Sequence, residues 1–157
     1  MNTPEISTAP SRLHAFLNKQ VANFALLTVK FHQHHWYITG DKFYELHVKF
    51  QEFYEKVFEH YDAVAERLLI LGYKPAATMK EYLELTSLSE GNGSTSWKEI
   101  INGVITDFTQ LNNELKAGIV IAKVSGDSVT ESMLVEMAEY YQKELWMLKT
   151  YNMDSTN

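Results

Sequence analysis

Apolar residues recur every three to four positions along most of the chain, and this spacing limits its fold more than any other feature. Two stripes are especially clear, one between residues 12 and 38 and one between residues 41 and 72. They comprise Leu13, Phe16, Leu17, Val21, Phe24 and Ala25 in the first, and Leu46, Phe50, Phe53, Val57, Tyr61, Val64 and Leu68 in the second. Each stripe predicts a long amphipathic helix with one buried face.

Helix-ending and helix-starting signals divide the chain into four long segments. A Thr-Gly-Asp sequence at 39–41 interrupts the first helix, and Gly72 ends the second. Ser96 and Glu99 have the spacing of a capping box that opens a third helix. The third and fourth helices are expected over 97–123 and 129–151, and one short helix is expected within "MKEYLELTSL", residues 79–88.

The length of the connection at residues 72–95 indicates the topology of the helices. Four long helices with no strand candidate predict an all-α four-helix bundle, and one crossover of this length is typical of ferritin-like topology. We therefore expect a ferritin-like four-helix bundle with a short extra helix in the crossover. A chain of 157 residues is long enough for one such domain over residues 1–157, with residues 1–10 as a flexible N-terminal segment.

Composition excludes several classes of function. The chain has no cysteine, so a transition metal would have to be bound by histidines and carboxylates. The formal net charge is −6 and no basic arm is present, which makes DNA binding an unlikely main activity. No apolar run approaches ~18 residues and no signal-peptide layout opens the sequence, so a cytoplasmic location without a membrane span is expected.

The stretch "FHQHHWYITGD", residues 31–41, raises the question of a metal site. Ferritin-like bundles usually bind iron within one chain through Glu-x-x-His, but no histidine here has an acid three positions before it. His35 and His47 flank the break at Gly40, so an antiparallel hairpin places them at about the same level. Asp62 and Glu66 are four residues apart and share a helix face.

These two pairs cannot bind one metal within one chain. Fifteen residues separate His47 from Asp62, roughly 22 Å along a helix, although they point in broadly the same direction. A two-fold axis through this face would bring the histidines of one chain to the carboxylates of another and would complete two sites per dimer. An isolated monomer is therefore expected to bind iron poorly.

The spacing of these residues resembles that of the Dps family, the mini-ferritins named as DNA-binding proteins from starved cells. The motifs are His-Trp at 35–36, Gly-x-x-Phe-x-x-Leu-His at 40–47 and Asp-x-x-Ala-Glu-Arg at 62–67, and the likeness extends over most of the chain. The resemblance implies a cytoplasmic shell of twelve subunits with ferroxidase centres at two-fold interfaces. Iron would be oxidised there, preferentially by hydrogen peroxide, and stored inside as ferric mineral.

The resemblance also assigns roles to individual residues. His35 and His47 match the family's histidine ligands, whereas Asp62 and Glu66 match the carboxylate ligands of the partner subunit in a two-iron centre. Trp36 matches the tryptophan beside the centre, which intercepts oxidising equivalents. Zinc and other divalent ions are expected to compete with iron for these ligands.

Three features depart from the family pattern. Gln51 stands four positions after His47, where many members have an acid, so the affinity for the second metal is expected to change. The family lines its three-fold entry pore with acids near the start of the last helix, whereas here Asp127 and Glu131 are the only acids and are shifted by one position. They are candidate pore residues, although such a pair is more often a helix N-terminal cap. The basic tail of the DNA-binding members is missing.

Other residues have simpler explanations. His32 either supports His35 or forms a hydrogen bond within its helix, and Arg67 is expected in an interfacial ion pair. The remaining histidines and tryptophans are expected in structural, solvent or interface positions: His14, His34, His60, Trp97 and Trp146. Two rival functions stay open, namely a Dps-type nucleoid shell that binds and protects DNA, and a structural bundle whose metal site has decayed.

Overall fold

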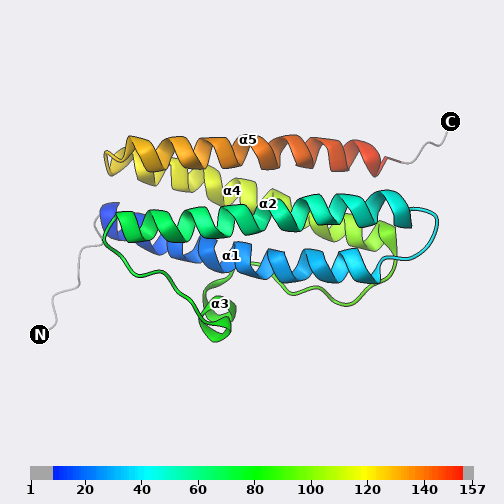
Figure 1. Ribbon diagram of the computed structural model, residues 1–157. Helices are drawn as coiled ribbons and strands as arrows, with labels where there is room; N and C mark the ends of the chain where they lie inside the picture. Colours follow the sequence, from blue (N-terminus) through cyan, green and yellow to red (C-terminus); the bar gives the residue numbers. More distant parts are fainter. Residues whose placement is uncertain (1–8, 154–157) are drawn as a thin grey trace, which may run out of the picture.

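The computed structural model describes residues 9–153, which form five helices and no strand (Figure 1). Four of the helices are long and form the bundle, and the remaining helix, α3, is short. Their bounds are α1 Ala9–Tyr37, α2 Phe43–Ile70, α3 Met79–Leu85, α4 Trp97–Val124 and α5 Ser128–Tyr151. The predicted all-α four-helix bundle with an extra helix in its crossover is confirmed.

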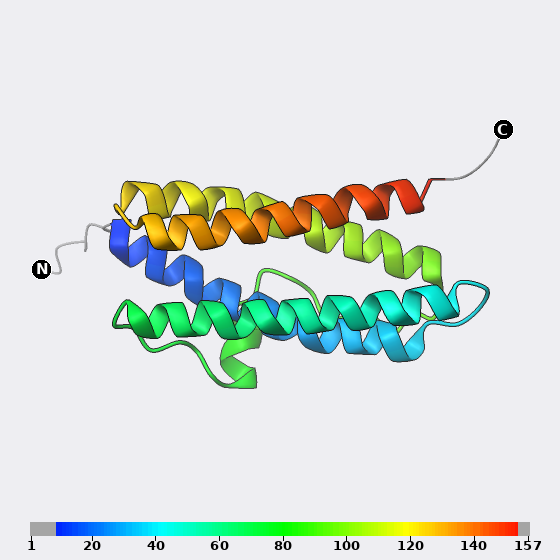
Figure 2. The same ribbon diagram turned by 45° about the horizontal axis from the view of Figure 1, so that its top comes forward.

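The helices pack as two antiparallel pairs, α1 with α2 and α4 with α5 (Figures 1 and 2). A short turn closes each pair, and a glycine with positive φ lies in each turn: Gly40 at 99° and Gly126 at 71°. Glycine favours this left-handed conformation because it has no Cβ. The turn at Gly40 fixes the level at which α2 starts beside the end of α1, and it therefore positions the predicted histidine pair.

The crossover from α2 to α4 runs along the bundle and carries α3 against α1. Buried side chains of α1 hold it in place. Asn23 is fully buried and accepts hydrogen bonds from the Thr86 hydroxyl at 2.7 Å and the Ser87 amide at 3.0 Å. Ser87 also donates to Glu114 of α4 at 2.6 Å, so three separate segments share one polar network.

Helix starts follow the predicted capping signals. Ser96 caps α4 by accepting a hydrogen bond from the Glu99 amide, which confirms the predicted helix start. The reciprocal half of the predicted capping box is absent, because the Ser96 amide donates to the Ser94 hydroxyl and the Glu99 carboxylate accepts from Ser94. Residues 1–8, most of the predicted flexible segment, lie outside the described residues. Within residues 9–153 no helix is both long and apolar enough to cross a bilayer.

Two histidines away from the hairpin end lie inside the bundle, and one of them departs from the expectation. His60 was expected at solvent or an interface, but its Nδ1 lies 2.6 Å from the buried Tyr141 hydroxyl, and burial lowers its pKa to about 4. The reason is that α5 covers this side of α2, which helical periodicity cannot reveal. His34 is structural, as expected: it packs against Phe31 and Phe50, and burial lowers its pKa to about 4.

Candidate metal centre

His35 and His47 lie face to face at the end of the α1–α2 hairpin. Their rings are nearly parallel, with centroids 3.6 Å apart and an interplanar angle of 16°. His35 Nδ1 lies 2.6 Å from the backbone oxygen of His47, and His47 Nδ1 lies 2.8 Å from the backbone oxygen of His35. The predicted juxtaposition of the two imidazoles across the Gly40 turn is confirmed.

This reciprocal pairing fixes which nitrogen of each ring can bind a metal. A carbonyl oxygen only accepts hydrogen bonds, so each Nδ1 must carry the proton and donate it. In the neutral ring, Nε2 then keeps its lone pair, which is the form that ligates a transition metal. Both side chains are also immobilised before any metal arrives, because His35 is only 8% exposed and His47 is half-buried.

Aromatic side chains surround the histidine pair. The Tyr54 ring meets His35 edge to face at 5.3 Å and stacks on His32 at 3.7 Å. His32 Nδ1 donates to the Thr28 carbonyl at 2.6 Å, which is the hydrogen bond within the helix that the sequence left open as one of two roles. Trp36, at 5.4 Å from the His32 ring, is 66% exposed.

Tyr54 was not predicted from the sequence, although a signal for it existed. It stands seven residues after His47, and two helix turns place such residues on nearly the same face. This spacing does not by itself predict a site residue, because single aromatic residues in an amphipathic helix are usually core residues. Here the ring is half-buried and contacts a predicted ligand directly.

Asp62 and Glu66 lie on the exposed face of α2, far from the histidines of the same chain. Within residues 9–153 no group of three or more histidine, aspartate or glutamate side chains could hold a metal ion. This agrees with the expectation that each chain carries two half-sites. The assignment of all four residues as ligands stays a prediction.

The exposed face of α2 also carries large apolar side chains. They alternate with Gln51, Asp62 and Glu66 at three- and four-residue spacing. Five apolar residues of α2 are at least half exposed: Tyr44 at 85%, Val48 at 55%, Phe58 at 57%, Leu69 at 60% and Ile70 at 72%. Apolar exposure of this kind is typical of protein–protein contact surfaces.

Gln51 is exposed one turn after His47, and its amide nitrogen donates to Glu55 at 3.0 Å. The amide hydrogen bond points the carbonyl oxygen of Gln51 away from Glu55. A neutral oxygen ligand at this place would bind a second cation more weakly than a carboxylate would. The effect of Gln51 on metal affinity stays a prediction.

Asp127 is the N-cap of α5, where its carboxylate accepts a hydrogen bond from the Thr130 amide. It also forms an ion pair with Arg67 at 3.0 Å, so Arg67 is paired within the chain and not at an interface as expected, because the start of α5 lies beside the end of α2. Burial alone would raise the pKa of Asp127, but the hydrogen bonds from Thr130 and the charge of Arg67 lower it. Glu131 is half-buried one turn later, and a pore role for this pair remains a prediction.

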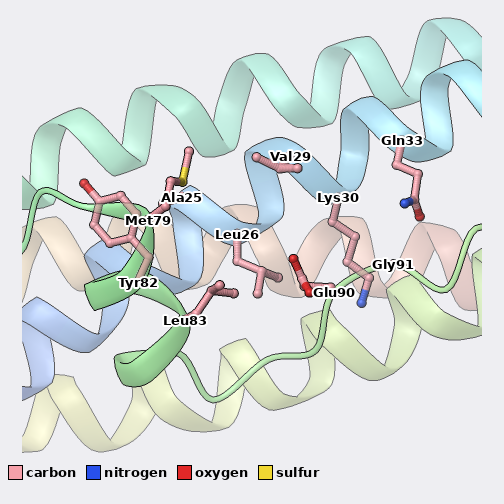
Figure 3. A pocket seen from close by; sticks show the side chains of 10 residues that line it. All are labelled: Ala25, Leu26, Val29, Lys30, Gln33, Met79, Tyr82, Leu83, Glu90 and Gly91. Atoms are coloured by element: carbon pink, nitrogen blue, oxygen red, sulfur yellow. The ribbon is translucent and has the colours of Figure 1, made fainter.

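A pocket of about 470 Å³ opens between α1, α3 and the crossover, away from the histidine pair (Figure 3). Its walls are mainly apolar, with Val29, Met79 and Leu83 exposed by more than half at its rim. The one cation that lines it, Lys30, is bound to Asp107 at 2.8 Å and to the Ser89 carbonyl at 2.8 Å. Lys30 is therefore already engaged by protein groups and is not available to a ligand of this pocket.

The tryptophans outside the site differ from each other. Trp97 is half-buried and meets Tyr151 at 5.8 Å, as expected of a packing residue. Trp146 is 64% exposed and is therefore not a core residue of the single chain. His14 stacks on Tyr73 at 4.1 Å near the opposite end of the hairpin from His35.

The bundle, its single crossover and the histidine pair define a ferritin-like protein. Residues 14–154 match the Ferritin-like domain family, and the chain belongs to the Dps branch of this family. General stress protein 20U of Bacillus subtilis is 44% identical over 135 residues, which cover 86% of this chain and 93% of that protein. DNA protection during starvation protein 2 of Bacillus anthracis is 40% identical over 86% of this chain and 92% of its own length.

Solved structures agree in fold. A Dps protein from Bacillus brevis superposes with a TM-score of 0.90 and 36% identity, covering 98% of this chain and 100% of that one. The Dps protein from Vibrio cholerae O1, described as a ferritin-like diiron-carboxylate protein, has a TM-score of 0.89 and 28% identity over 98% of both chains. Dps from Listeria innocua, studied after soaking with zinc, has a TM-score of 0.86 and 38% identity over 88% of this chain and 94% of that one.

Proposed function

We propose that this protein is an iron-storing mini-ferritin that oxidises Fe(II) at centres shared between two subunits. The observation that carries the proposal is the His35–His47 pair, whose hydrogen-bonded Nδ1 atoms leave both Nε2 atoms available as ligands. Membership in the Dps family and the diiron-carboxylate description of the Vibrio cholerae relative support iron as the substrate.

The carboxylates complete the centre from the partner chain. Asp62 and Glu66 lie on the α2 face that also exposes Phe58 and Leu69. A second copy that covers these apolar residues in a two-fold arrangement brings its own carboxylates to the histidines. Glu66 bridges the two irons when both are bound, and the negative charge of both carboxylates favours Fe(III) over Fe(II).

Two Fe(II) ions together supply the two electrons that hydrogen peroxide needs. The balanced reaction consumes two Fe(II), one peroxide and two protons, and it yields two Fe(III) and two water molecules. Because both electrons arrive at one centre, the O–O bond is broken without release of a hydroxyl radical. Trp36, the exposed ring beside His35, intercepts oxidising equivalents that escape this pairing.

The product ions are stored as ferric mineral inside a shell of twelve subunits, and the shell protects the cytoplasm from iron and peroxide together. Asp127 and Glu131 are the candidate pore residues through which Fe(II) enters. Zinc binds the same nitrogen and oxygen donors and competes with iron, an expectation supported by the zinc-soaked Listeria innocua relative.

A subunit-mixing experiment tests the shared centre. His47→Ala and Asp62→Ala chains are each assembled alone and then co-assembled, and peroxide-driven Fe(II) oxidation is followed by ferric absorbance. Each variant alone is expected to be inactive, whereas mixed dimers contain one site with intact histidines and intact carboxylates. Random pairing predicts recovery of about a quarter of the wild-type sites.

The outcome separates the possible arrangements. Lack of recovery in well-formed mixed assemblies would show that the ligands come from one chain. If wild type itself produced no ferric absorbance with Fe(II) and peroxide, the protein would be a structural bundle whose site has decayed.

A second candidate is a nucleoid-type shell that binds and protects DNA, with iron oxidation secondary. The name of the Bacillus anthracis relative, DNA protection during starvation protein 2, favours this possibility. The formal net charge of −6 opposes it, because duplex binding depends on lysines and arginines that contact the phosphates. A gel-shift assay at moderate salt distinguishes the two, since the iron-storage proposal predicts free DNA.

A further inference from the structure

The rings beside the metal centre form a continuous stack that leads away from the ligand His35. From His35 the sequence of contacts is Tyr54 at 5.3 Å, then His32 at 3.7 Å, then Trp36 at 5.4 Å. The first of these rings is a phenol in direct contact with a predicted ligand. The last is an exposed indole at the protein surface.

Tyr54 is held rigidly in this position. One face of its ring stacks on His32 at an angle of 15°, and its contact with His35 is nearly perpendicular at 88°. His32 is in turn fixed by its hydrogen bond to the Thr28 carbonyl. A phenol carries a proton and an oxidisable ring together, so it can release one electron and one proton in a single step.

The centre has a specific need for such a donor. Peroxide requires two electrons, whereas one Fe(II) supplies only one. Gln51 puts a neutral amide where a carboxylate would hold a second cation more firmly, so we expect this protein to pass through a centre with a single iron. In that state the second electron has to come from the protein if no hydroxyl radical is to be released.

We propose that Tyr54 is the one-electron donor that completes the reduction of peroxide when only one iron occupies the centre. The proposal rests on the ferroxidase function proposed above. One Fe(II), the Tyr54 phenol, one peroxide and one proton yield one Fe(III), the neutral Tyr54 radical and two water molecules. A later Fe(II), with one proton, reduces the radical to the phenol and becomes Fe(III).

Position explains why Tyr54 acts rather than another aromatic residue. Trp36 is 66% exposed and reaches the ligand only through two intervening rings, so it is the surface end of the stack. Tyr61 and Tyr82 pair with each other through their hydroxyl groups instead of contacting a predicted histidine ligand. Tyr44 is 85% exposed and touches Phe43, outside the stack.

The test uses the intact assembly loaded with one Fe(II) per centre and mixed with one equivalent of peroxide. Samples frozen within the first turnover are examined by electron paramagnetic resonance for an organic radical. Wild type is expected to give a tyrosyl signal whose hyperfine structure changes when the protein contains ring-deuterated tyrosine. Tyr54→Phe, which keeps the ring stack and removes the hydroxyl, is expected to lose this signal and to release hydroxyl radical to a spin trap.

Tyr73→Phe is the matched control at the opposite end of the hairpin, where the Tyr73 ring stacks on His14, and it should keep the signal. With two Fe(II) per centre, Tyr54→Phe should oxidise iron as wild type does, because both electrons then come from iron. A tyrosyl signal that persists in Tyr54→Phe, or a wild-type radical located on tryptophan and lost in Trp36→Phe, overturns the inference. These outcomes leave the ferroxidase proposal intact, whereas that proposal fails on its own if wild type oxidises no iron under either loading.

Discussion

Replacing Phe58 by alanine is expected to abolish iron oxidation without touching a single predicted ligand. Phe58 stands one turn before Asp62 on the exposed face of α2, and its ring contributes little to the fold of its own chain. If the centre is completed by a second chain, this ring lies in the contact that brings the half-sites together. Loss of the contact should then separate His35 and His47 from the carboxylates that complete their site.

The expected loss of dimer stability follows from the exposed area of the Phe58 side chain. Phe58 is 57% exposed in the single chain, which is about 110 Å² of an aromatic side chain of about 200 Å². Covering this area contributes about 3 kcal/mol at about 25 cal/mol per Å². A two-fold contact contains the residue twice, so Phe58→Ala weakens the dimer by at most about 6 kcal/mol, or about 10⁴-fold in its dissociation constant.

Sedimentation analysis and ferric absorbance, measured on the same samples across a range of protein concentrations, check this prediction. Phe58→Ala should dissociate at concentrations where wild type is assembled, and oxidation should fall in parallel with assembly. Phe58→Leu keeps most of the apolar area and serves as the control that stays assembled and active. A dissociated Phe58→Ala chain that oxidises iron at the wild-type rate would refute the argument for a shared site.

Three further substitutions test the fold and the remaining assignments. His34→Phe should reduce the acid sensitivity of the fold, as measured by urea titration. The pKa of His34 is about 4 in the fold against an ordinary value of 6.5, so the unfolded chain binds more protons between these values and His34 alone lowers the wild-type free energy of unfolding by about 3 kcal/mol as pH drops through this window. His60, whose pKa is also about 4, keeps its own contribution in the variant. Gly118→Ala should destabilise the fold, because the added Cβ would lie 2.2 Å from an aromatic ring of α1, and overpacking costs about 1–3 kcal/mol against a helix-propensity gain of about 1 kcal/mol. Gly103→Ala has open space around the added Cβ, so it should raise the melting temperature. Asp127→Ala should cost about 1–2 kcal/mol through the lost cap and ion pair, and Glu131→Ala should instead slow iron uptake with unchanged melting temperature if this residue lines the pore.

Helix positions were predictable from sequence because they depend on local signals. The Gly40 turn and the Ser96 N-cap each act within a few residues, and apolar spacing along α1 and α2 marks the faces that pack together. The histidine pair was predictable for the same reason, since a short turn between two helices brings residues at similar distances from it to one level. Asp62 and Glu66 share a face because four residues make about one turn.

Contacts between segments far apart in the chain could not be predicted in this way. The burial of His60 against Tyr141 depends on where α5 crosses α2, and the ion pair of Arg67 with Asp127 depends on the same packing. The position of Tyr54 between His35 and His32 required the actual rotation of both helices about their axes. None of these relations has a repeating spacing along the sequence.

The sequence by itself therefore determined the four long helices, the single crossover and the position of His35 beside His47, because helical periodicity and turn chemistry are properties of neighbouring residues. The tertiary structure alone decided which imidazole nitrogens are free. His35 and His47 each donate from Nδ1 to the other's backbone carbonyl, and this exchange requires the two helix ends to meet at hydrogen-bonding distance. Such distances arise from packing between helices, which no local pattern in the chain encodes.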